Sequence, residues 1–201
     1  MQRIDLLIAG SLVLAAAGSA VGLLAYDDTR RASTFEITWA LSSTAVVGAP
    51  ESHTAGGAHE VRLPVRLRNL TSVDLTVMIT AAGPRLQGGR VDVEVRAPGY
   101  GPVTASGQLT AGPGVQTIEV PVRVELGDAP DERTVAARSP DAALARLNGT
   151  HGTGRGAGVW TITVTFPPGV VVDREAHTIE VAGQARTFRA IVTLEAPATN
   201  R

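Results

Sequence analysis

The chain of 201 residues contains no cysteine, which excludes disulfide bonds, thiolate metal sites, blue-copper ligation and a thiol nucleophile. It contains no lysine either, so all 18 basic residues are arginine. With 19 acidic residues the net charge is -1, which argues against the broad basic surface of a general nucleic-acid binder. Aromatic residues make up only 3%, whereas Val and Thr are abundant, and this bias favours strands. Without disulfides, the fold depends on its hydrophobic core alone.

An apolar stretch without charged residues runs from Leu6 to Tyr26. It provides about 20 residues, or roughly 30 Å of helix, which is the thickness of the hydrocarbon core of a bilayer. We therefore expect residues 1–28 to be an N-terminal transmembrane anchor or signal segment that contacts the lipid bilayer through residues 4–26. Small residues at 18–20 suit a signal-peptide cleavage site, but the apolar run continues past them to Leu24. Retention as an anchor is the preferred interpretation.

Two Asn-x-Thr sequons, at Asn69 and Asn148, suit a chain that is exported across a membrane, where they could be glycosylated. Arginines on the two sides of the apolar stretch are nearly balanced and do not fix its orientation. We expect residues 29–201 to lie outside the cytoplasm. The protein is then a single-pass membrane protein, or a secreted one if the N-terminal segment is cleaved.

Alternation of apolar and polar residues with period two dominates the rest of the chain, which predicts strands with one buried and one solvated face. The pattern covers residues 35–41, 61–67, 73–79, 91–95, 118–126, 160–166, 178–181 and 187–194. Such strands, separated by Gly/Pro/Asn turns, predict an all-β, antiparallel two-sheet sandwich of the immunoglobulin-like type. Pro64 and Pro121 interrupt two of the patterns and place those strands at sheet edges or bulges.

Residues 127–158 lack this alternation and form a long excursion between strands. Within it Ser139, Pro140 and Asp141 are typical of a helix N-cap, its first-turn proline and an early acidic residue. Leu144 and Leu147 lie on one face of the short helix and are expected to pack on the sandwich.

Several residues are candidates for a site but have a simpler structural explanation. The glycine-rich run 152–158 follows a helix and precedes a strand, the reverse of a phosphate-binding loop, and is interpreted as a flexible linker. The histidine spacing matches no standard metal-ligand pattern, so solvated loop histidines are preferred. These residues are His53, His59, His151 and His177.

Two groups of charged residues are interpreted in the same way. An acidic group could bind calcium weakly, but a solvated loop is preferred; it comprises Asp128, Asp131 and Glu132. A basic stripe could contact an acidic partner or lipid head groups, but protection of an edge strand is preferred; it comprises Arg62, Arg66 and Arg68. No serine-nucleophile motif occurs.

Residues Ala25 to Thr29, directly after the apolar stretch, and the segment from Val65 to Leu75 resemble TasA/camelysin-type secreted fibre proteins. The second segment is equally similar to adhesion-type extracellular modules. The resemblance implies an extracellular β-sandwich. No glycine follows Asn69, where the family's turn usually has one.

These observations predict a membrane-anchored, extracytoplasmic β-sandwich with a non-enzymatic structural or interaction role, without cofactor or metal. It would act in a cell-surface assembly or as an accessory subunit of a membrane protein complex, through a protein partner or self-assembly. The first strand, Phe35–Leu41, is the candidate for strand exchange with a neighbour. The alternative is a surface module that binds a sugar, peptide or ion with its loops. An enzyme would need His53, His59 and a carboxylate around one cleft.

Overall fold

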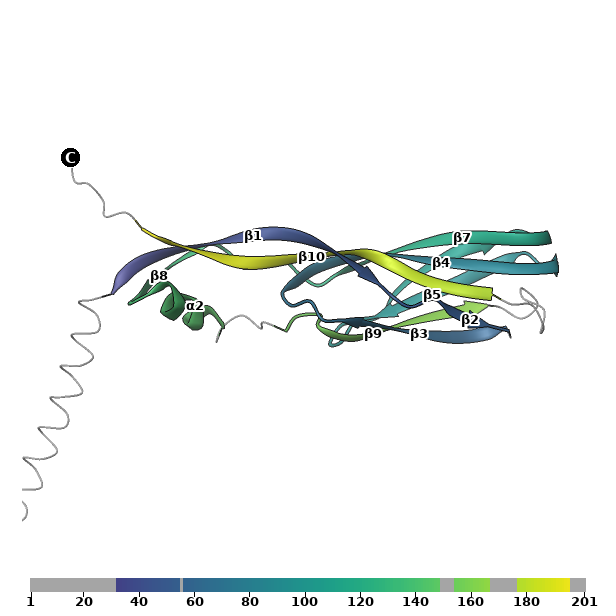
Figure 1. Ribbon diagram of the computed structural model, residues 1–201, viewed down its shortest axis with the longest axis horizontal. Coiled ribbons are helices and arrows are strands. Elements are labelled where there is room, and N and C mark those ends of the chain that lie inside the picture. Colours follow the sequence, from purple (N-terminus) through teal and green to yellow (C-terminus); the bar gives the residue numbers. More distant parts are fainter. Residues whose placement is uncertain (1–31, 55, 149–153, 167–176, 196–201) are drawn as a thin grey trace, which may run out of the picture. The chain divides into compact units, whose positions relative to one another are not determined.

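The computed structural model describes residues 32–54, 56–148, 154–166 and 177–195, which are mostly β and form two antiparallel sheets packed as a sandwich (Figure 1). The chain divides into two units. The larger contains Trp39–Pro130 and His151–Arg189; the smaller contains Met1–Thr38, Asp131–Thr150 and Ala190–Arg201. The elements are β1 (Ser33–Val47), β2 (Glu51–His53), β3 (Gly57–Val65), β4 (Leu70–Leu86), β5 (Gly89–Arg96), β6 (Val103–Leu109), β7 (Gly112–Glu125), β8 (Arg133–Ala137), α2 (Pro140–Asn148), β9 (Gly158–Phe166) and β10 (His177–Leu194).

The larger sheet has the strand order β7-β4-β10-β1-β8, and β2 also pairs with β10. The smaller sheet has the order β3-β9-β5-β6. In the larger unit, β4, β7 and β10 form one layer, and β3 and β9 lie in the other (Figure 1). The two-sheet sandwich predicted from the alternation is confirmed.

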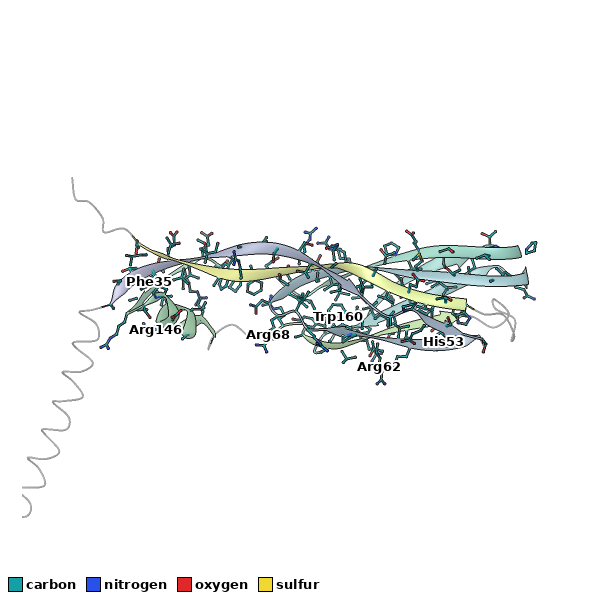
Figure 2. All side chains as sticks on the ribbon, viewed as in Figure 1. Phe35, His53, Arg62, Arg68, Arg146 and Trp160 are labelled. Carbon is teal, nitrogen blue, oxygen red and sulfur yellow. The ribbon has the colours of Figure 1, made fainter. Side chains whose placement is uncertain are left out.

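The core of the larger unit lies between the inner faces of these two sheets. Alternate residues are buried along β3, β5 and β9, as the period-two pattern predicts, and Val, Ile and Leu predominate in the core. Trp160 is fully buried between the layers (Figure 2), and its indole Nε1 donates a 2.7 Å hydrogen bond to the carbonyl oxygen of Gly156. The largest aromatic side chain of the core therefore also has its polar atom satisfied.

Two of the predicted strands are one. Residues 178–181 and 187–194 both belong to β10, which continues across a register shift between Arg186 and Thr187. The alternation changes phase at this irregularity, and a change of phase looks like a strand end in the sequence. The alternation pattern did not predict β2, β6 and β8, because these strands are short or rich in small and polar residues.

Both prolines lie on edge strands, as expected for residues that lack a backbone N–H group. Pro64 is on β3, at the edge of the smaller sheet, and Pro121 is on β7, at the edge of the larger one. A proline cannot donate to a neighbouring strand, so an edge position costs no hydrogen bond of the ladder. The prediction of two edge strands is confirmed.

In the smaller unit, β8 pairs with Ser33–Ile37 of β1, and α2 packs against β8. The predicted N-cap is confirmed, because Ser139 Oγ accepts a 3.2 Å hydrogen bond from the amide of Ala142. Leu147 is buried and Leu144 is half-buried. The excursion therefore contains the predicted helix, together with a strand that was not predicted.

The predicted anchor, residues 1–28, lies outside the described residues. Among the helices of the described part, none is long and apolar enough to span a bilayer.

The packing at Gly183 leads to a stability prediction. On β10 this residue lies opposite Leu75 of β4, and a Cβ added to it would come within 2.2 Å of the backbone oxygen of Asp74. Because a backbone atom of a paired strand cannot move aside, we expect Gly183→Ala to lower the free energy of unfolding by roughly 1 to 3 kcal/mol. Urea denaturation of the two proteins measures the difference.

Gly101→Ala is the matched control. A Cβ at Gly101 has nothing within 4 Å, so this variant should stay within about 0.5 kcal/mol of the parent. Equal stability of the two variants would contradict the close approach of β10 to β4 at this position.

Candidate functional site

A groove of about 630 Å³ lies on the larger unit and is lined by residues from four neighbouring strands and the segment after β7. Its volume falls within the range of small-molecule sites. The lining contains hydroxyl groups, both charge signs and one exposed leucine, and no aromatic ring. The lining residues are Leu41, Ser42 and Ser43 of β1, Thr71 and Ser72 of β4, Arg123 and Glu125 of β7, Arg186 of β10, and Asp128 and Ala129.

Charges of alternating sign run across the sheet along this groove. The guanidinium of Arg123 bonds to the carboxylate of Glu125, and its other nitrogen lies 3.5 Å from Asp74 Oδ1. Arg186 Nε lies 4.0 Å from the second oxygen of Asp74. The hydrogen bond with Glu125, and then the charge of Asp74, raise the pKa of Arg123 above its ordinary value. Because these side chains are largely exposed, the network orients the polar groups more than it stabilises the fold.

The hydroxyl groups of the groove are held by partners on neighbouring strands. Ser42 Oγ and Thr187 Oγ1 are 2.8 Å apart, and Ser43 Oγ donates a 3.1 Å bond to Gln184 Oε1. Thr71 Oγ1 donates to the backbone oxygen of Arg186. Because rigid strands carry these groups, they are arranged before any ligand arrives.

Arg155 holds the segment after β7 that contributes Asp128 and Ala129 to the lining of the groove. Its terminal nitrogen donates a 2.8 Å hydrogen bond to the carbonyl oxygen of Asp128, and its guanidinium lies 5.9 Å from the ring centre of Phe188. The neighbouring Gly156 is buried, with a φ of 70°. A Cβ there would lie 2.7 Å from Leu126 Cδ1, so glycine is required. The linker interpretation of this glycine-rich run is therefore wrong for residues 154–158; residues 152 and 153 lie outside the described part.

Three of the four histidines lie together rather than on solvated loops, so that interpretation is wrong for them. Ring centres are 4.2 Å apart for His53 and His59, 4.8 Å for His59 and His177, and 5.5 Å for His53 and His177. His177 is fully buried, and the ring of Phe166 lies 4.6 Å from it. Figure 2 labels His53, which is the last residue of β2 and precedes the start of β3. His151 lies outside the described residues.

The sequence contained a signal for this cluster. His59 has the same parity as Val61 and Leu63 on β3, and His177 the same parity as Ile179 on β10. Period-two alternation therefore places both imidazoles on the inner faces of the sheets. Their meeting required the pairing of β2 with β10, which sets His53 opposite His177. No local pattern predicts that pairing.

The predicted glycosylation sites remain predictions. Asn69 occupies the turn between β3 and β4 with a φ of 57°, and its carbonyl oxygen accepts a 3.0 Å hydrogen bond from the amide of Phe188. Asn148 is the last residue of α2, and the rest of its sequon lies outside the described residues.

The basic stripe does not form along one strand. Arg62 is on β3, points away from the core and pairs with Glu60 at 3.0 Å, whereas β3 ends at Val65 before Arg66 and Arg68 (Figure 2). The acidic group is divided too. Asp128 lines the groove in the larger unit, and Asp131 and Glu132 belong to the smaller one.

The contact of Arg155 with Asp128 leads to a second prediction. Arg155→Ala removes the hydrogen bond that fixes residues 127–129, so their amide hydrogens should exchange faster with deuterium than in the parent protein. Mass spectrometry of peptides covering this segment measures the effect. Arg96→Ala is the control, since Arg96 pairs with Glu94 on β5. Unchanged exchange at 127–129 in Arg155→Ala would show that this arginine does not hold the segment.

The chain matches no family model and no curated protein. Among solved structures it is similar to the family 11 carbohydrate-binding module from Clostridium thermocellum, solved in complex with a β-1,3-1,4-mixed-linked tetrasaccharide. That match has a TM-score of 0.28 and 10% identity, and covers 75% of this chain and 87% of the other. A chain of Desmodium yellow mottle tymovirus matches with a TM-score of 0.32 and 9% identity, covering 82% and 92%. At these TM-scores neither likeness indicates what this chain binds or does.

Proposed function

We propose that this chain is a membrane-anchored, extracytoplasmic β-sandwich that works by contact with another protein rather than by catalysis. It serves in a cell-surface assembly or as an accessory subunit of a membrane complex. The uncharged apolar stretch 6–26 supports an anchor, and the groove offers polar contacts without a nucleophile paired to a base. The immunoglobulin-like subtype of the sandwich stays a prediction from the sequence.

The observation that carries this proposal is the long free edge of β1. Among the described strand pairings, β8 covers β1 only from Ser33 to Ile37, which leaves one backbone edge of Ala40–Val47 open in the larger unit. Leu41 and Val47 on this stretch are about 70% exposed, at 70% and 72%. An open edge with apolar side chains is a template for an added strand from a partner.

Two other edge strands differ from this one in a way that supports the proposal, whereas the edge strand β6 also lacks charges and prolines. The edge strand β3 carries Arg62 and Pro64, and the edge strand β7 carries Pro121. Charges and prolines of this kind prevent edge-to-edge association. Residues 38–47 contain neither a charge nor a proline, so this edge lacks that protection.

The predicted strand exchange through Phe35–Leu41 needs a correction. Phe35 and Ile37 are buried and paired with β8, so they are not available to a neighbour without opening the sheet. The contact is therefore assigned to residues 40–47.

Because the chain has no natural cysteine, one introduced thiol reports on one surface. We expect Thr44→Cys, on the open edge, to cross-link to a partner or to a second copy when cells are treated with a short bismaleimide. Thr165→Cys is the matched control: it is equally exposed, but lies on β9 inside the smaller sheet. Gel mobility and mass spectrometry of the adduct distinguish a second copy, at twice 20.8 kDa, from another protein.

The same variants test the location of the domain. In intact cells a membrane-impermeant maleimide should label both thiols, and the protein should stay with the membrane fraction after carbonate washing. Deletion of residues 4–26 should abolish both results. Thiols that react only after cell lysis would overturn the extracytoplasmic placement, and equal cross-linking at positions 44 and 165 would overturn the edge contact.

The second candidate function is a ligand-binding module that uses the groove, favoured by its volume and its fixed hydroxyl and charged groups. A ligand held there raises the midpoint of thermal unfolding by mass action. A screen of peptides, oligosaccharides and ions should find a compound that stabilises the parent and Thr44→Trp but not Ser43→Trp, because only residue 43 lines the groove. A compound that stabilises all three equally binds elsewhere and would count against the groove.

A further inference from the structure

The geometry points to a divalent metal site of the zinc type between the two sheets, with His53, His59 and His177 as ligands and Glu51 beside them. His53 and Glu51 are on β2, and His177 is on β10 of the same sheet. His59 is on β3 of the other sheet. An ion held by these side chains would tie the two layers of the sandwich together. This inference concerns the core and does not depend on the proposed function.

The three imidazoles are placed by strand register, which makes their arrangement reproducible. The Cα atoms of His53 and His177 are direct cross-strand partners, so their side chains leave the sheet on the same face. The buried His177 shows that this is the inner face. His59 is on β3 of the facing sheet, and it alternates in step with the core residues Val61 and Leu63 of that strand. Ligands carried by strands of both layers need no loop to order on binding.

The separations of the rings fit common ligation. Zinc bonds an imidazole nitrogen at about 2.0 to 2.1 Å, which puts each ring centre roughly 3 Å from the ion and two ligating ring centres roughly 5 Å apart. The observed separations are 4.2, 4.8 and 5.5 Å. The spacing of the rings is therefore already in the range for ligands of one ion.

Ring orientation is what has to change. His53 and His59 stack at 30°, and in the described part of the chain no three acidic or histidine side chains already converge on one point as ligands. Ligation requires rotation about the side-chain bonds of His53 and His59 that turns their nitrogens toward a point shared with His177. Both residues are only half-buried, so they have room for that rotation.

A further observation in favour of a metal site is the surroundings of His53 Nε2. This nitrogen is buried and has no hydrogen-bond partner within the described residues, and Glu51 Oε2 lies 3.7 Å from it. A buried polar atom without a partner costs roughly 1 to 3 kcal/mol and calls for an explanation such as an ion. Imidazole nitrogens with a nearby carboxylate are a donor set suited to Zn²⁺, Ni²⁺ or Cu²⁺.

Titration of the full-length chain in mild detergent with ZnCl₂ tests this inference. Calorimetry should give one ion per chain. Zinc at a hundredfold excess over the Kd should raise the midpoint of thermal unfolding by roughly 5 to 10 °C. Mg²⁺ at the same concentration should have no effect, because it prefers oxygen ligands. Absence of zinc binding by the parent protein would overturn the inference.

The variants identify the ligands. His59→Phe keeps an aromatic ring against His53 and Phe166 but removes both nitrogens, and it should weaken zinc binding by roughly tenfold or more. His53→Ala and His177→Ala should do the same, and Glu51→Gln should have a smaller effect. His151→Ala is the control, because this histidine is not among the proposed ligands, and the variant should bind like the parent.

The circular dichroism and the melting temperature without zinc show whether each variant is folded. A folded His59→Phe protein that binds zinc like the parent, or a loss of binding in His151→Ala, would overturn the assignment. Cross-linking at Thr44 is independent of these results, so failure of the metal site and failure of the proposed function are distinguishable.

Discussion

Burial of one face of each sheet against the other is the interaction on which the rest of this structure depends. The chain has no disulfide to constrain its unfolded state, so the apolar inner faces must supply the stability. Val, Ile and Leu at alternate positions fill most of that interface, with Trp160 as its largest member. Because a shift of one residue would turn each apolar set toward solvent, the same packing also fixes the strand register. That register determines the geometry of both the groove and the histidine cluster.

Much of the fold could be predicted because its physical cause is local. Alternation over residues 57–65 or 118–125 needs no knowledge of the neighbouring strand, and the capping of α2 by Ser139 is contained in three residues. Strands without a clear apolar face were missed for the same reason: β6 is built largely from Thr, Ala, Ser, Gly and Gln. The change in the phase of alternation along β10 is a tertiary effect, and because of it the sequence predicts two strands where the structure has one.

The candidate site could not be predicted, because none of its parts is local. The groove joins Ser43 of β1 to Glu125 of β7, and these strands become near neighbours only through the order β7-β4-β10-β1. A non-local order of this kind is decided by packing of the whole sandwich rather than by any sequence window. The histidine cluster is an intermediate case. Parity alone places His59 and His177 on inner faces, but it does not tell which residue each one meets.

The two sites differ in the kind of interaction that each can support. The network of Arg123, Asp74, Glu125 and Arg186 is exposed and balanced in charge, so it contributes little to the stability of the fold. The histidines lie against one another and only His177 is fully buried, and bonds to an ion would act directly on the stability of the folded state. Along β10, Arg186 and His177 are nine residues apart, or roughly 30 Å at the rise of a strand. The proposed ion and a proposed partner would therefore act at separate places on the sandwich, and a change at one need not disturb the other.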